Sequence, residues 1–308
     1  MIKAAVIGVG YLGRFHAQKY SNNPSVELVG VCDHNPENAK LVAGELQTKA
    51  FEKPQDLIGQ VDAVTIAAST QAHYELGRLF LEAGIPVNLE KPLAATLPQA
   101  RELVDLAAKK QTLLCTGHIE RFNPSLIELK KTLKKPVAFD LIRHTAFRAR
   151  GADVSVLHDL MIHDLDLVLW LTGGKVTSLT ASGSKVLQPT WDAAEVSLEL
   201  STGALARISV SRVSNRPARM VRVLEKGTSI TVDSGALTME IVTPSGGTAE
   251  PLATETLQVA KRDALQDETD AFVNAVMGKA SPVVTGEDGL IALELVTKID
   301  EAIQGRSV

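Results

Sequence analysis

The chain has 308 residues, of which 45% are hydrophobic, and a formal net charge of −4. This length provides for two domains with full cores, and the mixing of acids and bases along the chain gives no reason to expect a nucleic acid or an anionic membrane as partner. No apolar run approaches the ~18–20 residues of a membrane span. Met1-Ile2-Lys3 leads directly into the first predicted strand without a signal peptide, so we expect a cytoplasmic protein.

Residues 1–121 alternate short apolar runs with amphipathic stretches, and both cysteines fall in such runs. Alternation of this kind predicts βαβ crossovers, hence a Rossmann domain with a parallel sheet between helices. We expect Cys32 and Cys115 to be core residues, which argues against a disulfide framework or thiolate catalysis. The predicted strands are Ala4–Ile7, Leu28–Cys32, Ala63–Ala67, Val87–Leu89 and Thr112–Gly117.

A G-x-G-x-x-G turn, Gly8 to Gly13, follows the first strand and opens a predicted helix. In a dinucleotide-binding turn the first glycine allows the tight bend, the second admits the pyrophosphate to the backbone, and the third lets helix and strand pack closely. The phosphates then bind N–H groups at the helix start, here from Gly10, Tyr11 and Leu12 onward.

Asp33 ends the second predicted strand, ~20 residues beyond the last glycine of the turn. A carboxylate at this place accepts hydrogen bonds from the ribose 2′-hydroxyl and repels a 2′-phosphate. No lysine or arginine follows in residues 34–38. The sequence therefore predicts NAD as the cofactor rather than NADP.

Glu90-Lys91-Pro92 directly follows the apolar strand Val87–Leu89. The carboxyl ends of strands in an open α/β sheet face the cofactor crevice, so Lys91 is expected near the nicotinamide. Pro92 biases Lys91 towards an extended backbone, which directs its side chain. The alternative is a solvated surface lysine.

Gly117 to Pro124 lies where the chain leaves the Rossmann domain, a usual place for residues that line a ligand cleft. His118, Arg121 and Asn123 are candidate substrate-binding residues there. Arg121 could hold a phosphate or carboxylate, or form an interdomain ion pair.

The segment from Asp159 to Gly174 predicts a buried helix with one polar stripe, because most of its other positions are apolar. At about 100° per residue, Asp159, His163, Asp166 and Trp170 fall within roughly 60° of one another. His163 suits general acid/base chemistry, although a structural His–Asp pair is the alternative. His158 and His163 are ~140° out of phase and cannot ligate a metal together, so no metal is expected.

Residues 122–308 predict a second, α+β domain with a large open antiparallel sheet. Ala194–Leu200 and Ala206–Arg212 alternate with period two, and turn signals at 201–203, 225–227 and 233–235 suit hairpins. The polar-looking face of this sheet is only weakly polar, so we expect it to cover a pocket or to meet another subunit in a homodimer or homotetramer. Amphipathic helices at Asp263–Gly278 and Gly289–Ile303 complete the fold.

Together these motifs resemble the glucose-fructose oxidoreductase/inositol dehydrogenase/MocA (Gfo/Idh/MocA) family over essentially the whole chain. The resemblance rests on the glycine turn, on Glu90-Lys91-Pro92 and on the D-x-x-x-H motif of Asp159 and His163. It implies an NAD-dependent oxidoreductase in which His163 takes the proton of a substrate hydroxyl while Lys91 stabilises the alkoxide, with Asp159 orienting substrate or base. It further implies cofactor contacts from Ala68, Ser69, Thr70 and Glu90.

Within that family, residues 10–16 and 117–124 are similar to the UDP-N-acetylglucosamine 3-dehydrogenases, which prepare the sugar for amination on the way to amide-linked lipid A. Residues 144–150 are less proline-rich than in that group, and Arg148 and Arg150 are candidates for a diphosphate. The resemblance thus implies a sugar or nucleotide-sugar substrate. The alternatives are a dehydrogenase of a free sugar or inositol, and a non-catalytic NAD-binding regulator.

Overall fold

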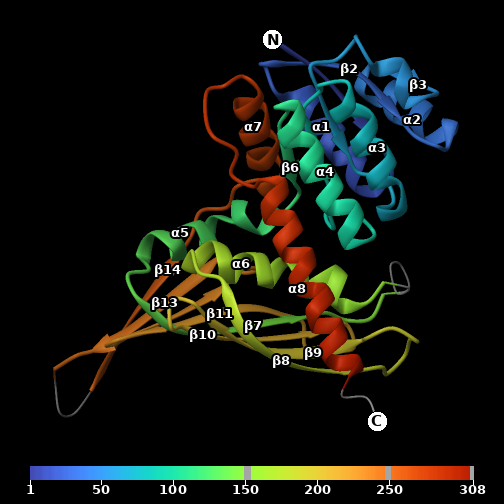
Figure 1. Ribbon diagram of the computed structural model, residues 1–308. Coiled ribbons are helices and arrows are strands. Elements are labelled where there is room, and N and C mark those ends of the chain that lie inside the picture. The colour runs from blue at the N-terminus through green and yellow to red at the C-terminus, as the bar shows by residue number, and fades with distance from the viewer. Residues whose placement is uncertain (149–153, 247–250, 306–308) are drawn as a thin grey trace. The chain divides into compact units, whose positions relative to one another are not determined.

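The computed structural model describes residues 1–148, 154–246 and 251–305 (Figure 1). The chain divides into two compact units. The first comprises Met1–Ile119 and Asp263–Leu293, and the second comprises Glu120–Arg262 and Glu294–Val308. The sequence placed the whole of residues 122–308 in the second domain, whereas the fold returns Asp263–Leu293 to the first unit. Within the described ranges, no helix is long and apolar enough to cross a membrane.

The first unit has the predicted Rossmann architecture, a parallel sheet of six strands with helices on both faces. The strand order is β3-β2-β1-β4-β5-β6, which reverses direction between β1 and β4. Ligands bind outside the carboxyl ends of the strands at such a reversal. The elements are β1 (Ile2–Ile7), α1 (Tyr11–Asn22), β2 (Val26–Cys32), α2 (Pro36–Leu46), β3 (Lys49–Phe51), the 3₁₀ helix η1 (Pro54–Leu57), β4 (Ala63–Ile66), α3 (Thr70–Glu82), β5 (Val87–Leu89), α4 (Leu97–Lys110), β6 (Leu114–Thr116) and, after the second unit, α7 (Ala264–Val276).

Alternate residues of β1 face two different cores, because side chains alternate across a strand. Ala4 and Val6 pack in a cluster that includes Tyr20 of α1 and Phe272 of α7. Ala5 and Ile7 pack in a cluster with residues of α3 and α4. The central strand is therefore apolar at nearly every position, as expected for a sheet covered on both faces.

The segment Asp263–Leu293 packs in the first unit because it carries apolar residues that belong to the two cores of that unit. Phe272 and Val273 are 3% and 2% exposed and belong to the core cluster on one face of the sheet. Leu290 and Leu293 belong to the cluster on the other face. Residues from the end of the chain thus complete both faces of a sheet made from its beginning.

The second unit contains an eight-stranded sheet of order β14-β13-β12-β11-β7-β10-β9-β8. All neighbouring strands are antiparallel except β7 and β10, which pair in parallel. Its elements are the 3₁₀ helix η2 (Ile119–Phe122), α5 (Pro124–Thr132), β7 (Pro136–His144), the π turn η3 (Leu157–Met161), α6 (Ile162–Thr172), β8 (Val176–Ser184), β9 (Ala193–Leu200), β10 (Leu205–Ser211), β11 (Ala218–Glu225), β12 (Thr228–Asp233), β13 (Thr238–Pro244) and β14 (Leu252–Gln258), and the last helix, α8 (Gly286–Gln304), divides between the units.

The predicted alternation along the second sheet is present. In β9 the apolar residues from Ala194 to Leu200 are buried, whereas Glu195, Ser197 and Glu199 are exposed. The three predicted turns join β9 to β10, β11 to β12 and β12 to β13. One face is therefore covered and the other open, as expected for an antiparallel sheet.

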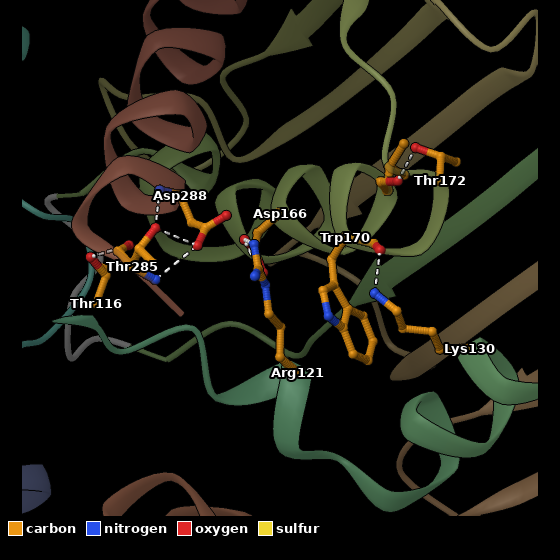
Figure 2. Close-up of polar contacts among 9 residues, drawn as sticks. Thr116, Arg121, Lys130, Asp166, Trp170, Thr172, Thr285 and Asp288 are labelled. Atoms are coloured by element: carbon orange, nitrogen blue, oxygen red, sulfur yellow. Dashed lines mark hydrogen bonds and ion pairs between the residues drawn. The ribbon is translucent and has the colours of Figure 1, made fainter. Parts of the chain in front are cut away.

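Two buried arginines tie α6 to the rest of the second unit. Arg143 of β7 bonds Asp164 through Nη2 at 2.7 Å and Glu120 through Nη1 at 2.6 Å. Arg121 of η2 bonds Asp166 through Nη2 at 2.6 Å and through Nε (Figure 2). Burial lowers the pKa of Arg143, but the carboxylates outweigh it and raise that pKa above its usual value, so its guanidinium stays charged.

Removing Arg143 should strongly destabilise the protein. Arg143→Ala leaves the carboxylates of Glu120 and Asp164 buried without their cation, so the free energy of unfolding should fall by about 3–5 kcal/mol. Urea denaturation at pH 7 measures this. Arg78→Ala, which removes a surface pair with Glu82, should stay close to wild type. Equal losses in the two variants would contradict the role of Arg143.

Candidate functional site

The turn between β1 and α1 has no room for side chains at two of its three glycines. Gly8 has a φ of +81°, and a Cβ there would lie 2.5 Å from the backbone nitrogen of Ala68. A Cβ on Gly13 would lie 1.7 Å from the carbonyl oxygen of Gly8. Both glycines are therefore required by the close approach of β1, α1 and the segment after β4.

Gly10 differs from the other two because a Cβ there would meet no protein atom within 4 Å. It is the N-cap of α1 and brings no side chain to the N–H groups of the first turn, where Tyr11 and Leu12 are exposed. A cavity of about 880 Å³ lies beside it, lined by residues of the turn, α1 and α2. An open backbone at a helix N-terminus is what a pyrophosphate needs, so the turn fits a dinucleotide.

Asp33 lies at the end of β2, where the cofactor ribose is expected, and is 6% exposed. Its Oδ2 accepts the N–H of Val9 at 2.7 Å, and its Oδ1 accepts the N–H of Asn35 at 2.9 Å. Oδ1 also lies 3.1 Å from Nδ1 of His34, whereas Oδ2 has a second lone pair beyond its bond to Val9, so the residue retains capacity for a ribose hydroxyl. Asp33 also fixes the glycine turn against the second strand.

The segment Ala68-Ser69-Thr70 connects β4 to α3, at the same carboxyl edge of the sheet. Ser69 is the exposed N-cap of α3, and Ala68 lies under the glycine turn. The buried His73 has Nε2 3.2 Å from the carbonyl oxygen of Ala68 and Nδ1 2.9 Å from that of Pro92. His73 thus links the two predicted cofactor-contact segments.

Glu90 and Lys91 follow β5, with Lys91 half-buried and joined to Pro92 by a cis peptide bond. The carboxylate of Glu90 is 2.8 Å from Nε2 of His16 on α1, and its Oε2 accepts the N–H of Lys91 at 3.2 Å. A Cβ on Gly117 would lie 2.8 Å from that same oxygen. Gly117 therefore makes room for the Glu90 carboxylate that fixes the backbone of Lys91.

A second buried glutamate, Glu268 of α7, adjoins this pair. Its Oε1 accepts a 3.4 Å bond from Nδ2 of Asn88 on β5. Burial and the charge of Glu90 raise the pKa of Glu268 to about 7. Burial lowers the pKa of His16, but the hydrogen bond and charge of Glu90 outweigh this and raise it.

In the second unit, Asp159 and His163 lie across the junction of η3 and α6. Asp159 is exposed in the π turn, and His163 is half-buried in the first turn of α6. The sequence predicted a regular α-helix here, whereas the i→i+5 bonds of η3 widen the turn that carries Asp159. Single π turns inside helices occur frequently at functional sites.

The other polar residues of the predicted stripe have structural partners. Asp166 bonds Arg121, whose side chain is 6% exposed, so the ion-pair interpretation of Arg121 fits better than a substrate contact, and the pair lies within the second unit. Asp164, which lies outside that stripe, bonds Arg143 of β7. The carbonyl of Trp170 accepts from Lys130 at 2.7 Å (Figure 2).

The remaining candidates for substrate binding lie in several places. His118 is 1% exposed in the first unit. Asn123 caps α5 by accepting the N–H of Ser125 and donates to the carbonyl of Ser234, which is a structural role. Arg148 is exposed, and Arg150 lies outside the described residues.

Sequence reasoning missed His16, His73 and Glu268. His16 and His73 each sit on a helix that follows a cofactor-contact segment, and that spacing was the available signal. Glu268 has no such local signal, because its partners lie far away in the chain. Both cysteines are buried as predicted, and burial raises the pKa of Cys32 to about 11 and of Cys115 to about 12.

The sequence patterns of two domain families match the chain. Residues 2–118 match "Oxidoreductase family, NAD-binding Rossmann fold", and residues 136–237 match "GFO/IDH/MocA C-terminal domain". These two ranges correspond to the glycine turn with its parallel sheet and to most of the open sheet. NAD is therefore the cofactor type of this Rossmann domain.

Several known proteins resemble the chain over nearly its full length. A UDP-N-acetylglucosamine 3-dehydrogenase of Acidithiobacillus ferrooxidans is 34% identical over 98% of this chain and 97% of the relative, and its crystal structure matches 99% of this chain and 98% of its own with a TM-score of 0.92. An inositol 2-dehydrogenase of Rhizobium meliloti is 26% identical over 96% and 94% of the two chains. An Agrobacterium radiobacter oxidoreductase in complex with NAD+, 19% identical over 99% and 97% of the two chains, shares the fold with a TM-score of 0.86.

Gly10→Ala should weaken NAD binding without unfolding the protein. Its Cβ meets no protein atom but occupies the space through which the pyrophosphate approaches, so NAD affinity should fall roughly tenfold or more. Isothermal titration calorimetry and thermal unfolding measure the two effects. Gly13→Ala, in contrast, should lose both stability and NAD binding. Unchanged NAD affinity in Gly10→Ala would show that the pyrophosphate binds elsewhere.

Proposed function

Because the chain belongs to the Gfo/Idh/MocA family of oxidoreductases, we propose that it is an NAD-dependent dehydrogenase that oxidises the 3-hydroxyl of UDP-N-acetylglucosamine. The observation that carries the proposal is the 34% identity, over 98% of the chain, to a relative with this named activity. The presence of Lys91, Asp159 and His163 supports it, because these residue types supply the cation, carboxylate and base that alcohol oxidation needs.

In this proposal the chain's own residues handle the hydroxyl proton. His163 accepts the proton of the sugar 3-hydroxyl through its imidazole, while the hydride leaves the same carbon and a 3-keto sugar remains. Lys91 stabilises the alkoxide that develops on the oxygen, and Asp159 orients the substrate or the base. Bound NAD+ supplies the hydride acceptor.

The cofactor contacts proposed for the first unit follow from its described geometry. Gly8, Gly10 and Gly13 shape the turn, and the N–H groups of Tyr11 and Leu12 open α1 beside it. Ala68, Ser69 and Thr70 lie at the same sheet edge. Asp33 favours a ribose 2′-hydroxyl over a 2′-phosphate by its charge and its place after β2.

A nucleotide sugar requires cationic groups for its diphosphate, and the exposed Arg148 is the described candidate. Arg121 is unsuited to this role because its guanidinium is buried against Asp166. An inositol or a free sugar is the competing substrate class, favoured by the 26% identity to the Rhizobium meliloti inositol 2-dehydrogenase. The product of the nucleotide-sugar reaction would be a ketone suited to amination.

Substrate competition separates these classes. The purified protein should reduce NAD with UDP-N-acetylglucosamine, and UDP alone should inhibit because arginine holds the diphosphate. Turnover with inositol or a free sugar but not with the nucleotide sugar would replace the proposed substrate. Tight NAD binding without turnover on any of these alcohols would point to a regulator.

His163→Ala should lower kcat by roughly 10² to 10⁴ if its imidazole is the base. The fall should occur with little change in NAD affinity or thermal stability, because the side chain is half-buried and belongs to the second unit. Steady-state kinetics and calorimetry measure these quantities. An unchanged kcat would return His163 to a structural role.

The open face of the second sheet is proposed to bind another copy of the chain. It combines charged residues such as Glu195, Arg207 and Arg222 with Ile142 and Met220 around a hollow of about 640 Å³. A broad face with apolar side chains among charges suits self-association. Light scattering should therefore give two or four times the chain mass, and a monomer at micromolar concentration would contradict this.

A further inference from the structure

Three acid–base side chains meet inside the first unit, next to Lys91. His16 comes from α1, Glu90 follows β5, and Glu268 comes from α7. One nitrogen or oxygen atom of each lies within 4.8 Å of those of the other two. His16 and Glu268 are 0% and 4% exposed, and the side chain of Glu90 is 12% exposed.

The hydrogen bonds in this cluster are unequally distributed. Glu90 has His16 on one oxygen and the N–H of Lys91 on the other. Glu268 has a single 3.4 Å bond from Asn88, and its Oε2 has no hydrogen-bond partner among the described residues. A buried carboxylate with one weak bond is unfavourable when ionised, because nothing replaces the water that it lost.

Charge balance points to the same conclusion. His16 and Glu90 form a contact at 2.8 Å that is neutral as a whole when both are charged. An ionised Glu268 would add an unbalanced negative charge within 4.8 Å of Glu90. One added proton on Glu268 removes that repulsion, just as two close carboxylates commonly share a proton.

Glu268 is the carboxyl group here that can change charge near neutral pH, and His16, whose pKa is raised from its ordinary value, is the other titrating member of the cluster. Tyr20 of α1 bonds Thr65 and has a raised pKa, and burial raises the pKa of Cys115 on β6 to about 12, so both stay neutral. Asn88 does not titrate. Burial raises the pKa of Glu90, but the hydrogen bond and charge of His16, together with the charge and backbone N–H of Lys91, outweigh it and lower that pKa.

We propose that Glu268 is a positioning residue for Lys91: it holds a proton beside the His16–Glu90 pair and so keeps the Glu90 carboxylate on the backbone N–H of Lys91. When Glu268 loses its proton, its negative charge competes with Glu90 for the His16 cation and repels the Glu90 carboxylate. The hold of Glu90 on Lys91 then weakens. The consequence for turnover rests on the proposed dehydrogenase function, whereas the proton and its effect on the Lys91 segment do not.

Infrared spectroscopy detects the proton directly in the wild-type protein. A buried protonated glutamic acid gives a carbonyl stretching band distinct from that of a carboxylate. The band assigned by difference between wild type and Glu268→Gln should be present at pH 6 and lost with a midpoint near pH 7. Absence of a titrating band in the folded wild-type protein would overturn the proposal, whether or not the variant folds.

The variant should also separate positioning from simple packing. Glutamine resembles the protonated side chain, so NADH affinity in Glu268→Gln should match wild type at pH 6. The ratio of variant to wild-type affinity should then rise about threefold or more by pH 8.5, because only the wild type acquires the extra charge. A ratio that is flat with pH would reduce Glu268 to a packing role and contradict the proposal.

The pH dependence of stability has a definite sign. The folded-state pKa of Glu268 is raised from 4.5 to about 7, so its contribution to the free energy of unfolding falls as pH rises between those values. Glu268→Gln should therefore gain stability relative to wild type over this range. Thr269→Ser, a change on the same helix at a hydroxyl that bonds the carbonyl of Leu265, should show none of these pH effects.

Elemental analysis tests a competing occupant of the cluster. A divalent cation bound at one equivalent in the purified wild type and absent from Glu268→Gln would overturn the proposal, because the metal would take the place of the proton. The NADH and infrared measurements need no sugar substrate. If they succeed while no alcohol is oxidised, the proposed function fails and the role of Glu268 stands.

Discussion

The first unit depends on the contact between the start of α1 and the glycine turn beneath it. A Cβ on Gly13 would lie 1.7 Å from the carbonyl oxygen of Gly8, so α1 can approach β1 this closely only with glycine at that position. The approach brings His16 to Glu90 and the hydroxyl of Tyr20 to Thr65. A single steric constraint thus fixes both the phosphate-facing turn and the polar groups that position the segment around Lys91.

The second unit depends on buried charge rather than on close backbone approach. The helix α6 is apolar at most positions, yet it carries Asp164 and Asp166, which are 2% and 1% exposed. Arg143 and Arg121 compensate these charges with bonds of 2.6–3.1 Å. Loss of either arginine would leave an unpaired buried carboxylate, which costs far more than the pair itself contributes. The helix that carries His163 is therefore held in place by the ion pairs of its two buried aspartates with Arg121 and Arg143.

Local pattern was sufficient to predict much of this protein. Strand and turn signals predicted the parallel strands from β1 to β6 except the short β3, and the three hairpins of the second sheet, because hydrophobic period and glycine placement are encoded within a few residues. The same holds for Asp33, whose place after β2 follows from the fingerprint spacing. The burial of Cys32 and Cys115 also followed from the apolar runs around them.

Features that depend on distant partners could not be predicted in this way. The amphipathic pattern of α7 indicates an apolar face but does not say which sheet it covers, so the return of Asp263–Leu293 to the first unit was missed. The parallel pairing of β7 with β10 has no signal in either strand. Arg121 has the chemistry of a phosphate ligand and of an ion-pair partner alike, and only the position of Asp166 distinguishes them.

The return of the chain also has a consequence for biosynthesis. The ribosome makes the whole of Glu120–Arg262 before Phe272 and Leu290, which complete the two faces of the first sheet. A nascent chain that has been made only as far as β6 therefore exposes apolar surface on both faces of the sheet, because the residues that cover this surface are not yet made. The nucleotide-binding half, although encoded first, therefore cannot complete its core until residues near the end of the chain are made, and a fragment ending near Ile119 would be expected to aggregate.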